Sequence, residues 1–126
     1  MEDILNSFQK SIERLDEILK DEKTLKTRDA AIQRFEFTSE LSWKCIQKFL
    51  REQGIICRSP KECLREAFKF GLVEDDERWI SILQDRNLTT HTYDEKVAED
   101  VYDRLPGYLE IFQKLFILLQ EKLIKE

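Results

Sequence analysis

The sequence is poor in the residues that make turns and in those that bind metals. Its 126 residues include three glycines, two prolines and one histidine. A β-sandwich or barrel needs many turns, so this scarcity argues against both and favours long helices. A single histidine and the lack of a Cys-x-x-Cys pair make a structural zinc site a poor prediction. We expect neither a metal nor a cofactor.

Cysteine is also scarce, with three residues in all. An odd count without paired spacing predicts no disulfide framework. Cys45 is predicted to be a small apolar core residue, whereas Cys57 and Cys63 have no assigned place.

Long hydrophobic runs are missing, and no stretch has the length needed to cross a bilayer. Met1-Glu2-Asp3 lacks the basic region and apolar stretch of a secretory signal, so we expect a cytoplasmic protein with no membrane partner. The net charge of −5 argues against a protein that coats nucleic acid nonspecifically. The net charge does not exclude a local basic cleft. Solvated surface is nevertheless the simpler interpretation of a basic cluster in the middle of the chain, which consists of Lys48, Arg51, Arg58, Lys61, Arg65 and Lys69.

Apolar residues recur at steps of three and four, which indicates amphipathic helices in one domain spanning residues 1–126. The first helix, about residues 2–20, has an apolar face of Ile4, Phe8, Ile12, Leu15 and Leu19. A second helix is predicted from Thr27, as N-cap, to about Gln53, with Gly54 as its left-handed stop. Its buried face is predicted to be Ala31, Phe35, Thr38, Cys45, Ile46 and Phe49.

A narrower apolar stripe, Phe37 with Leu41, falls on another side of this second helix. A helix that is apolar on two sides either lies at the centre of its bundle or buries one side in a partner. We favour a contact with a partner or with a second copy of the chain and assign Phe37 and Leu41 to it. A central helix remains the alternative.

The second half of the chain predicts three more helices. Ser59-Pro60-Lys61-Glu62 combines an N-cap serine, a proline at the first helical position and a capping glutamate, and the short helix that follows ends at Gly71. The next helix is predicted to begin at 74–76 and to end at 87–91. Its side chains predicted to face the core are those of Trp79, Ile80 and Leu83.

Asp94 is predicted to cap the last helix, and Pro106-Gly107 predicts a kink or a break within it. Its apolar positions include Val97, Val101, Leu105, Tyr108, Phe112, Leu115 and Leu119. The predicted fold class is all-α: an antiparallel up-and-down four-helix bundle with one short additional helix.

The segment from Asp85 to Tyr93 carries the groups best suited to chemistry. An uncharged His91, with an ordinary pKa of about 6.5, could take a proton from a ribose 2′-hydroxyl. Arg86 offers a charged fork that fits a phosphate, and Asn87 could orient either group. These residues outline a metal-independent ribonuclease that leaves a cyclic phosphate.

Helical geometry limits this hypothesis, because Arg86 and His91 are five residues apart and diverge on an unbroken helix. A shared site needs the helix to end between them, long side chains to converge over its end, or a two-fold partner to supply the second group. A symmetric dimer would also bring together two copies of His91.

A purely structural interpretation accounts for the same residues. His91 would cap carbonyl groups, Arg86 would pair with Asp85 or the acidic run 74–77, and Tyr93 would be a half-buried aromatic of the bundle. Spacing alone favours this interpretation.

The run from Arg86 to Tyr93 resembles the Arg-Asn-x-x-x-His-x-Tyr signature of HEPN-superfamily proteins. The chain as a whole resembles the nucleotidyltransferase substrate-binding protein family. Besides the signature, the segments that carry this likeness are 35–44 (FEFTSELSWK), 59–67 (SPKECLREA), Tyr93-Asp94-Glu95 and Pro106-Gly107-Tyr108.

The resemblance implies a helical bundle that dimerises and a separately encoded minimal nucleotidyltransferase as its partner. In one reading the chain is the non-catalytic, substrate-binding half of a two-component nucleotidyltransferase. In the other it is a ribonuclease toxin in which Arg86 and His91 are catalytic, Asn87 supports them, and the partner silences the enzyme by attaching AMP to Tyr93. A dimeric scaffold without any link to nucleotides is a third possibility.

Overall fold

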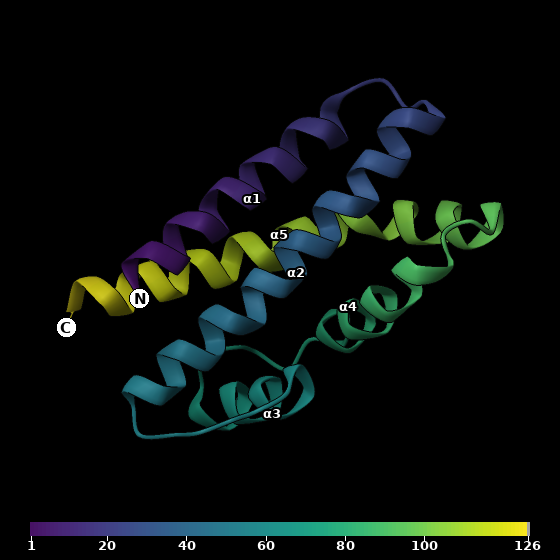
Figure 1. Ribbon diagram of the computed structural model, residues 1–126. Coiled ribbons are helices and arrows are strands. Elements are labelled where there is room, and N and C mark those ends of the chain that lie inside the picture. The colour runs from purple at the N-terminus through teal and green to yellow at the C-terminus, as the bar shows by residue number, and fades with distance from the viewer. Residues whose placement is uncertain (126) are drawn as a thin grey trace.

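The computed structural model describes residues 1–125, with side chains through Leu123, and these residues form helices and no strands. The long helices are α1 (Glu2–Lys20), α2 (Leu25–Glu52) and α5 (Glu95–Lys125). The short ones are α3 (Pro60–Phe70), α4 (Glu77–Leu88) and the 3₁₀ helix η1 (Thr89–His91). Figure 1 shows α1 on one side of α2 and α3 and α4 on the other, while α5 crosses behind α2 from the side of α4 to that of α1. The predicted all-α class is confirmed.

One hydrophobic core takes residues from all five α-helices. Phe8 of α1, Phe35 of α2 and Phe112 of α5 are fully buried at its centre, and the rings of Phe8 and Phe112 meet edge to face at 6.2 Å. Burying an aromatic side chain of this kind stabilises the fold by roughly 1.5–3 kcal/mol. The predicted inner face of α2 is buried at every position, which confirms the pattern read from the sequence.

The start of α2 differs from the prediction by three residues. Thr24 is the N-cap, its Oγ1 accepts from the Thr27 amide at 3.0 Å, and Thr27 Oγ1 accepts from the Thr24 amide at 2.7 Å. Thr27 is therefore the inner partner of a capping box, not the cap itself. The predicted stop is confirmed, because Gly54 has a φ of +83°.

Both ends of α3 lie where they were predicted, but Glu62 does not close a capping box on Ser59, because its Oε2 accepts from the Arg58 amide at 3.3 Å. Ser59 Oγ accepts from the Glu62 amide at 3.2 Å, and Gly71 ends the helix with a φ of +89°. The expected absence of a disulfide was wrong, because Cys57 and Cys63 are bonded to each other. The bond joins the segment before α3 to its first turn, and the odd cysteine is Cys45, which is buried as predicted.

Two predictions for the last helices were wrong in part. Ile80 of α4 is 59% exposed, and Ile82 is buried in its place, although Trp79 is buried as predicted. No break occurs at Pro106, because α5 runs through it without interruption. Leu105 and Tyr108 are buried on either side, and their packing offsets the backbone hydrogen bond that proline cannot make.

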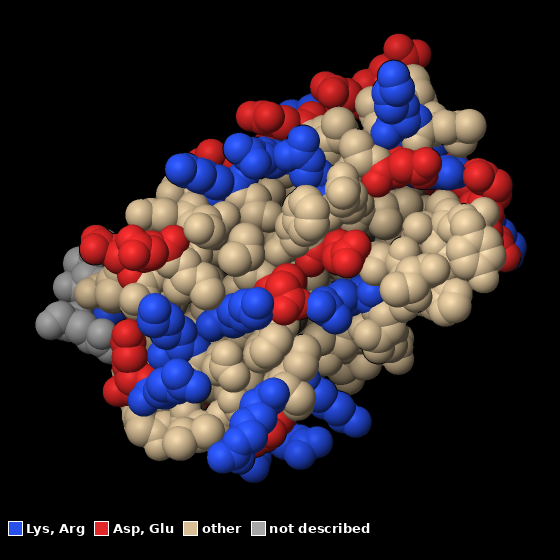
Figure 2. Space-filling model, in the orientation of Figure 1, with Lys and Arg blue, Asp and Glu red and all other residues tan. Residues whose placement is uncertain are grey.

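The cap of α5 is confirmed, since Asp94 Oδ1 accepts from the Lys96 amide at 2.9 Å. Lys and Arg side chains gather over α3 and the end of α2, at the lower end of Figure 2. None of the helices described is both long enough and apolar enough to cross a membrane.

Candidate functional site

The chain leaves the α-helical path between Arg86 and His91, which is one of the three predicted routes to a shared site. α4 ends at Leu88, and η1 continues from Thr89 to His91. Thr89 Oγ1 donates to the Arg86 carbonyl at 2.7 Å, and Thr92 Oγ1 donates to the Thr89 carbonyl at 3.1 Å. The Arg86 carbonyl also accepts from the Thr89 amide, so the threonine hydroxyls add hydrogen bonds at the end of α4.

Arg86 makes an ion pair with Glu40 of α2, through Nη2 and Oε2. The predicted pairing with Asp85 or the acidic run was wrong. Glu40 was not identified from the sequence, because 46 residues separate it from Arg86. Arg86 Nε is buried and has no acceptor among the residues described, so the pair with Glu40 uses only part of the guanidinium.

Glu40 is held by three donors. Besides Arg86, Trp43 Nε1 donates to its carboxylate at 3.1 Å and Lys44 Nζ lies 3.3 Å from it. Burial raises the pKa of Glu40, but these three partners outweigh it and keep the pKa below its ordinary value. The carboxylate is therefore charged at neutral pH and partly neutralises Arg86.

Asp85 is buried and faces α5, about 100° around α4 from Arg86. Arg104 donates to its carboxylate through Nε at 2.7 Å and Nη2 at 2.9 Å, and the Tyr108 hydroxyl donates to the same group. Burial, followed by the contact with Asp85, raises the pKa of Tyr108. This contact attaches α4 to α5 and fixes the rotation of α4 that turns Arg86 toward α2. Neither Arg104 nor Tyr108 was predicted here.

His91 and Tyr93 lie together on the surface. Their ring centroids are 6.0 Å apart, with an interplanar angle of 64°. Tyr93 is 81% exposed, so its interpretation as a half-buried bundle aromatic was wrong. Asn87 is exposed as well. Among the residues described, the structure pairs His91 with Tyr93 and Arg86 with Glu40, and records no direct contact between Arg86 and His91.

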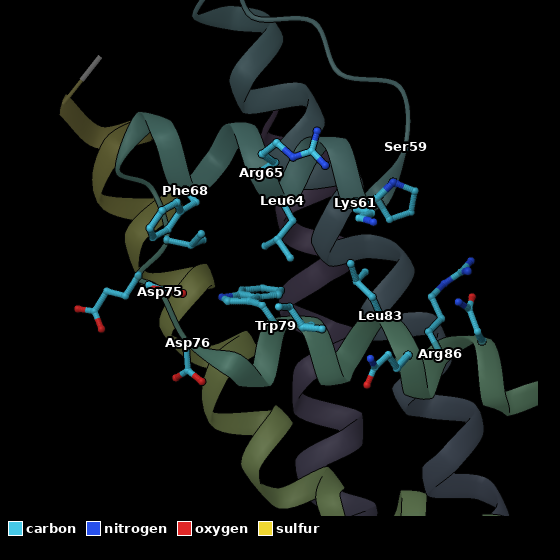
Figure 3. Close-up of a pocket in the computed structure, with 16 residues that line it drawn as sticks. Ser59, Lys61, Leu64, Arg65, Phe68, Asp75, Asp76, Trp79, Leu83 and Arg86 are labelled. Atoms are coloured by element: carbon cyan, nitrogen blue, oxygen red, sulfur yellow. The ribbon is translucent and has the colours of Figure 1, made fainter.

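A groove of about 790 Å³ opens between α3 and α4, and Arg86 and Asn87 line one end of it (Figure 3). Trp79 lies in the middle of the view, with Lys61 and Arg86 toward one end and Asp75 and Asp76 toward the other. This cavity was not predicted, although its basic residues Lys61 and Arg65 belong to the mid-chain cluster noted in the sequence.

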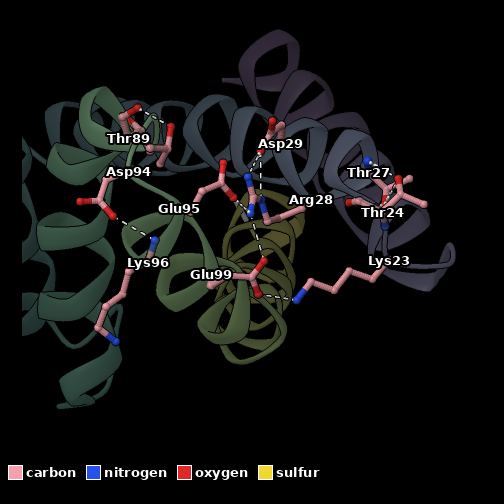
Figure 4. Close-up of polar contacts among 11 residues, drawn as sticks. Lys23, Thr24, Thr27, Arg28, Asp29, Thr89, Asp94, Glu95, Lys96 and Glu99 are labelled. Carbon is pink, nitrogen blue, oxygen red and sulfur yellow. Dashed lines mark hydrogen bonds and ion pairs between the residues drawn. The ribbon is translucent and has the colours of Figure 1, made fainter.

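The segment after Tyr93 is anchored by Arg28, which is only 2% exposed (Figure 4). Its Nη1 donates to Glu95 at 2.7 Å and to Glu99 at 3.0 Å, and its Nε donates to Asp29 at 3.0 Å. Glu95 and Glu99 belong to the first turns of α5. The hydrogen bond from Arg28 lowers the pKa of Glu95, and those from Lys23 and then Arg28 lower that of Glu99.

The stripe assigned to a partner is accessible. Phe37 is 52% exposed and Leu41 is half-buried, and both line a hollow of about 670 Å³ between α1 and α2. The rim is largely basic, with Lys10, Arg14, Arg34 and Lys44 around it. Glu40, the partner of Arg86, also lines this hollow, which therefore adjoins the Arg86 site.

Comparisons with known proteins agree with this architecture. Probable ribonuclease HepT of Haemophilus influenzae is 38% identical over 95 residues, which are 71% of this chain and 64% of that protein. The chain thus spans less than two thirds of the curated relative that it matches.

Two solved structures share the fold. A Thermus thermophilus protein superposes with a TM-score of 0.84 and 39% identity, covering 89% of this chain and 98% of that one. A Haemophilus influenzae protein, whose structure is described as revealing the fold of a substrate-binding domain of a nucleotidyltransferase, has a TM-score of 0.81 and 28% identity, covering 92% and 98%.

A sequence model of the family described as nucleotidyltransferase substrate binding protein like matches residues 3–121, nearly the full length. The chain belongs to the nucleotidyltransferase substrate-binding-protein-like family.

Proposed function

We propose that this chain is the helical subunit of a two-component nucleotidyltransferase and binds a separately encoded nucleotidyltransferase. Family membership supports this, and Phe37 is the observation that favours an interface on α2. Phe37 is 52% exposed and lies beside Leu41 above a basic rim. An exposed aromatic surrounded by charged residues is typical of a protein–protein contact.

Co-purification with the nucleotidyltransferase tests this interface. Phe37→Asp should weaken the complex at least about tenfold, because it places a charge where an apolar surface would be buried. Ile117→Asp is the matched control, since Ile117 of α5 is also 52% exposed and lies outside the hollow. Equal binding by both variants would contradict the proposed interface.

A second candidate function is a metal-independent ribonuclease, and the end of α4 between Arg86 and His91 favours it. His91 would take the proton from a 2′-hydroxyl, Arg86 would stabilise the charge on the phosphate, and Asn87 would orient either group. The name of the Haemophilus influenzae relative, probable ribonuclease, supports this function.

One exposed histidine cannot act as both acid and base on opposite sides of a phosphate at once. We therefore propose a homodimer in which two copies of His91 face the same RNA. Sedimentation of the purified chain should give a dimer. A monomer that cleaves RNA with a single His91 would contradict this arrangement.

Tyr93 is the proposed site of AMP transfer by the nucleotidyltransferase. Its 81% exposure leaves the side chain open to an enzyme, and its ring lies beside that of His91. A phosphodiester at this position adds bulk and negative charge where an RNA phosphate would approach. The pair would then be a toxin and its antitoxin in the cytoplasm.

Growth measurements test the ribonuclease. Expression of the chain alone should slow growth, and His91→Ala should relieve the effect. Thr90→Ala is the control, because Thr90 is exposed in the same turn and carries no group for this chemistry. Equal toxicity of wild type and His91→Ala would contradict the catalytic role of His91.

A further inference from the structure

The groove between α3 and α4 continues directly from the candidate site, because Arg86 and Asn87 line it. Its volume of about 790 Å³ lies within the usual range for a ligand site. Phe37 and Leu41 do not line it, so it is separate from the surface proposed for the nucleotidyltransferase.

The middle of the groove is apolar and open to solvent. Phe68 of α3 is 50% exposed, Ile80 of α4 is 59% exposed, and both line it beside Trp79. Leu64 and Leu83 also line it and are half-buried. Exposed aromatic and aliphatic side chains that flank a slot are suited to stacking against a flat aromatic base.

The two ends of the groove have opposite charge. Lys61 and Arg86 lie toward one end of it, and Asp75 and Asp76 lie toward the other (Figure 3). Arg65 and Glu74 also line the groove. Residues 44–69 contain seven Lys or Arg against three Glu, in a chain with a net charge of −5. An anion is therefore attracted to the end that meets the candidate site and repelled from the other.

Arg86 has donors to spare at this end. Glu40 engages Nη2, while Nε is buried without an acceptor among the residues described. The Arg86 side chain is 32% exposed, so a phosphate oxygen can reach the solvent-facing part of its guanidinium, although not the buried Nε.

We propose that the α3–α4 groove binds single-stranded RNA, with a base between Phe68 and Ile80 and a backbone phosphate at Lys61 and Arg86. The groove then delivers the strand to His91. The choice of RNA rests on the proposed ribonuclease function, but binding and cleavage use different residues and are measured separately.

The test uses a fluorescently labelled oligoribonucleotide with methylated 2′-hydroxyls, which cannot be cleaved through the 2′-oxygen. Lys61→Glu should weaken its binding at least about tenfold, and Phe68→Ser by about fivefold or more. Lys69→Glu is the control, because Lys69 is exposed on the same helix and does not line the groove; it should stay within about twofold of wild type.

Unchanged affinity for the oligonucleotide in both Lys61→Glu and Phe68→Ser, with unchanged thermal unfolding, would overturn the proposal that the groove binds RNA. Conversion of a dimer to a monomer by Ile80→Asp would also overturn it, because a second copy of the chain would then fill the slot. If the wild type binds the oligonucleotide through Lys61 and Phe68 but cleaves no natural RNA, the ribonuclease function fails and the groove stands. If the wild type cleaves RNA but the groove variants bind the oligonucleotide normally, the ribonuclease function stands and the proposed RNA-binding groove fails.

Discussion

Two arginines of this fold, Arg28 and Arg86, are both paired with carboxylates, yet their surroundings differ. Arg28 is 2% exposed and is surrounded by Asp29, Glu95 and Glu99. The Arg86 side chain is 32% exposed, has one carboxylate partner among the residues described, lines a groove and has a buried Nε without an acceptor. A guanidinium whose hydrogen-bond donors are paired with carboxylates holds helices together, whereas one with unpaired donors can bind a ligand.

Removing Arg86 should affect chemistry most. Arg86→Ala should reduce RNA cleavage by on the order of a hundredfold, as expected for the loss of a group that stabilises developing charge. Its stability should fall by less than about 1 kcal/mol, because the pair with Glu40 is partly exposed to solvent. Cleavage assays and thermal unfolding of the same protein measure the two effects. Cleavage by Arg86→Ala at the wild-type rate would contradict a role for Arg86 in the reaction.

Removing Arg28 should have the opposite effect to removing Arg86: a large loss of stability and little loss of cleavage. Arg28→Ala should lower the free energy of unfolding by about 2 kcal/mol, because it deletes a buried side chain and its hydrogen bonds. Cleavage by the folded protein should stay within a few-fold of wild type. Urea unfolding measures the loss, and a fall in cleavage as large as that of Arg86→Ala would erase the distinction between the two residues.

The stabilising effect of Arg28 should depend on pH in a defined direction. Arg28 lowers the pKa of Glu95, and Lys23 and then Arg28 lower the pKa of Glu99, from the ordinary value of 4.5. The contribution of the two carboxylates to stability is therefore complete above that value and is lost as the pH falls through the lowered values. The difference in melting temperature between wild type and Arg28→Ala should be constant from neutral pH to about 5 and should shrink below it. A difference that grows on acidification would contradict this sign.

The smallest effect is expected from Glu40. Glu40→Gln should change stability by less than about 1 kcal/mol, because the pair is partly solvated. It should tighten binding of the uncleavable oligonucleotide a few-fold, since a competing carboxylate no longer neutralises Arg86. Weaker binding would show instead that Glu40 holds Arg86 in position for its ligand.

The same contrast explains what the sequence could predict. Local patterns identified the inner face of α2, the caps Ser59 and Asp94, the stop at Gly54 and the end of α4 before His91, because each depends on residues close in sequence. The pairs Arg86–Glu40, Asp85–Arg104 and Arg28–Glu95 join separate helices, and no local pattern encodes them. The charged cluster that contributes to the groove was visible, but its position opposite α4 depends on the tertiary fold.

Two local predictions were wrong for reasons of context. The proline at 106 does not break α5, because buried residues on both sides hold the helix in place. The odd number of cysteines led to the wrong prediction of no disulfide. Cys45 is a buried free thiol, and the other two cysteines, Cys57 and Cys63, form the bond. Burial raises the pKa of Cys45 to about 12, so it should resist alkylation in the folded protein.

We propose that the nucleotidyltransferase partner acts on the Arg86–Tyr93 end of the molecule. The most direct test is the intact mass of this chain after co-expression with a nucleotidyltransferase encoded beside it. We expect the added mass of AMP on the wild type and its loss in Tyr93→Phe. Tyr102→Phe is the control and should keep the added mass, because Tyr102 is half-buried within α5. An unmodified wild type, or a Tyr93→Phe protein that still carries AMP, would contradict the claim.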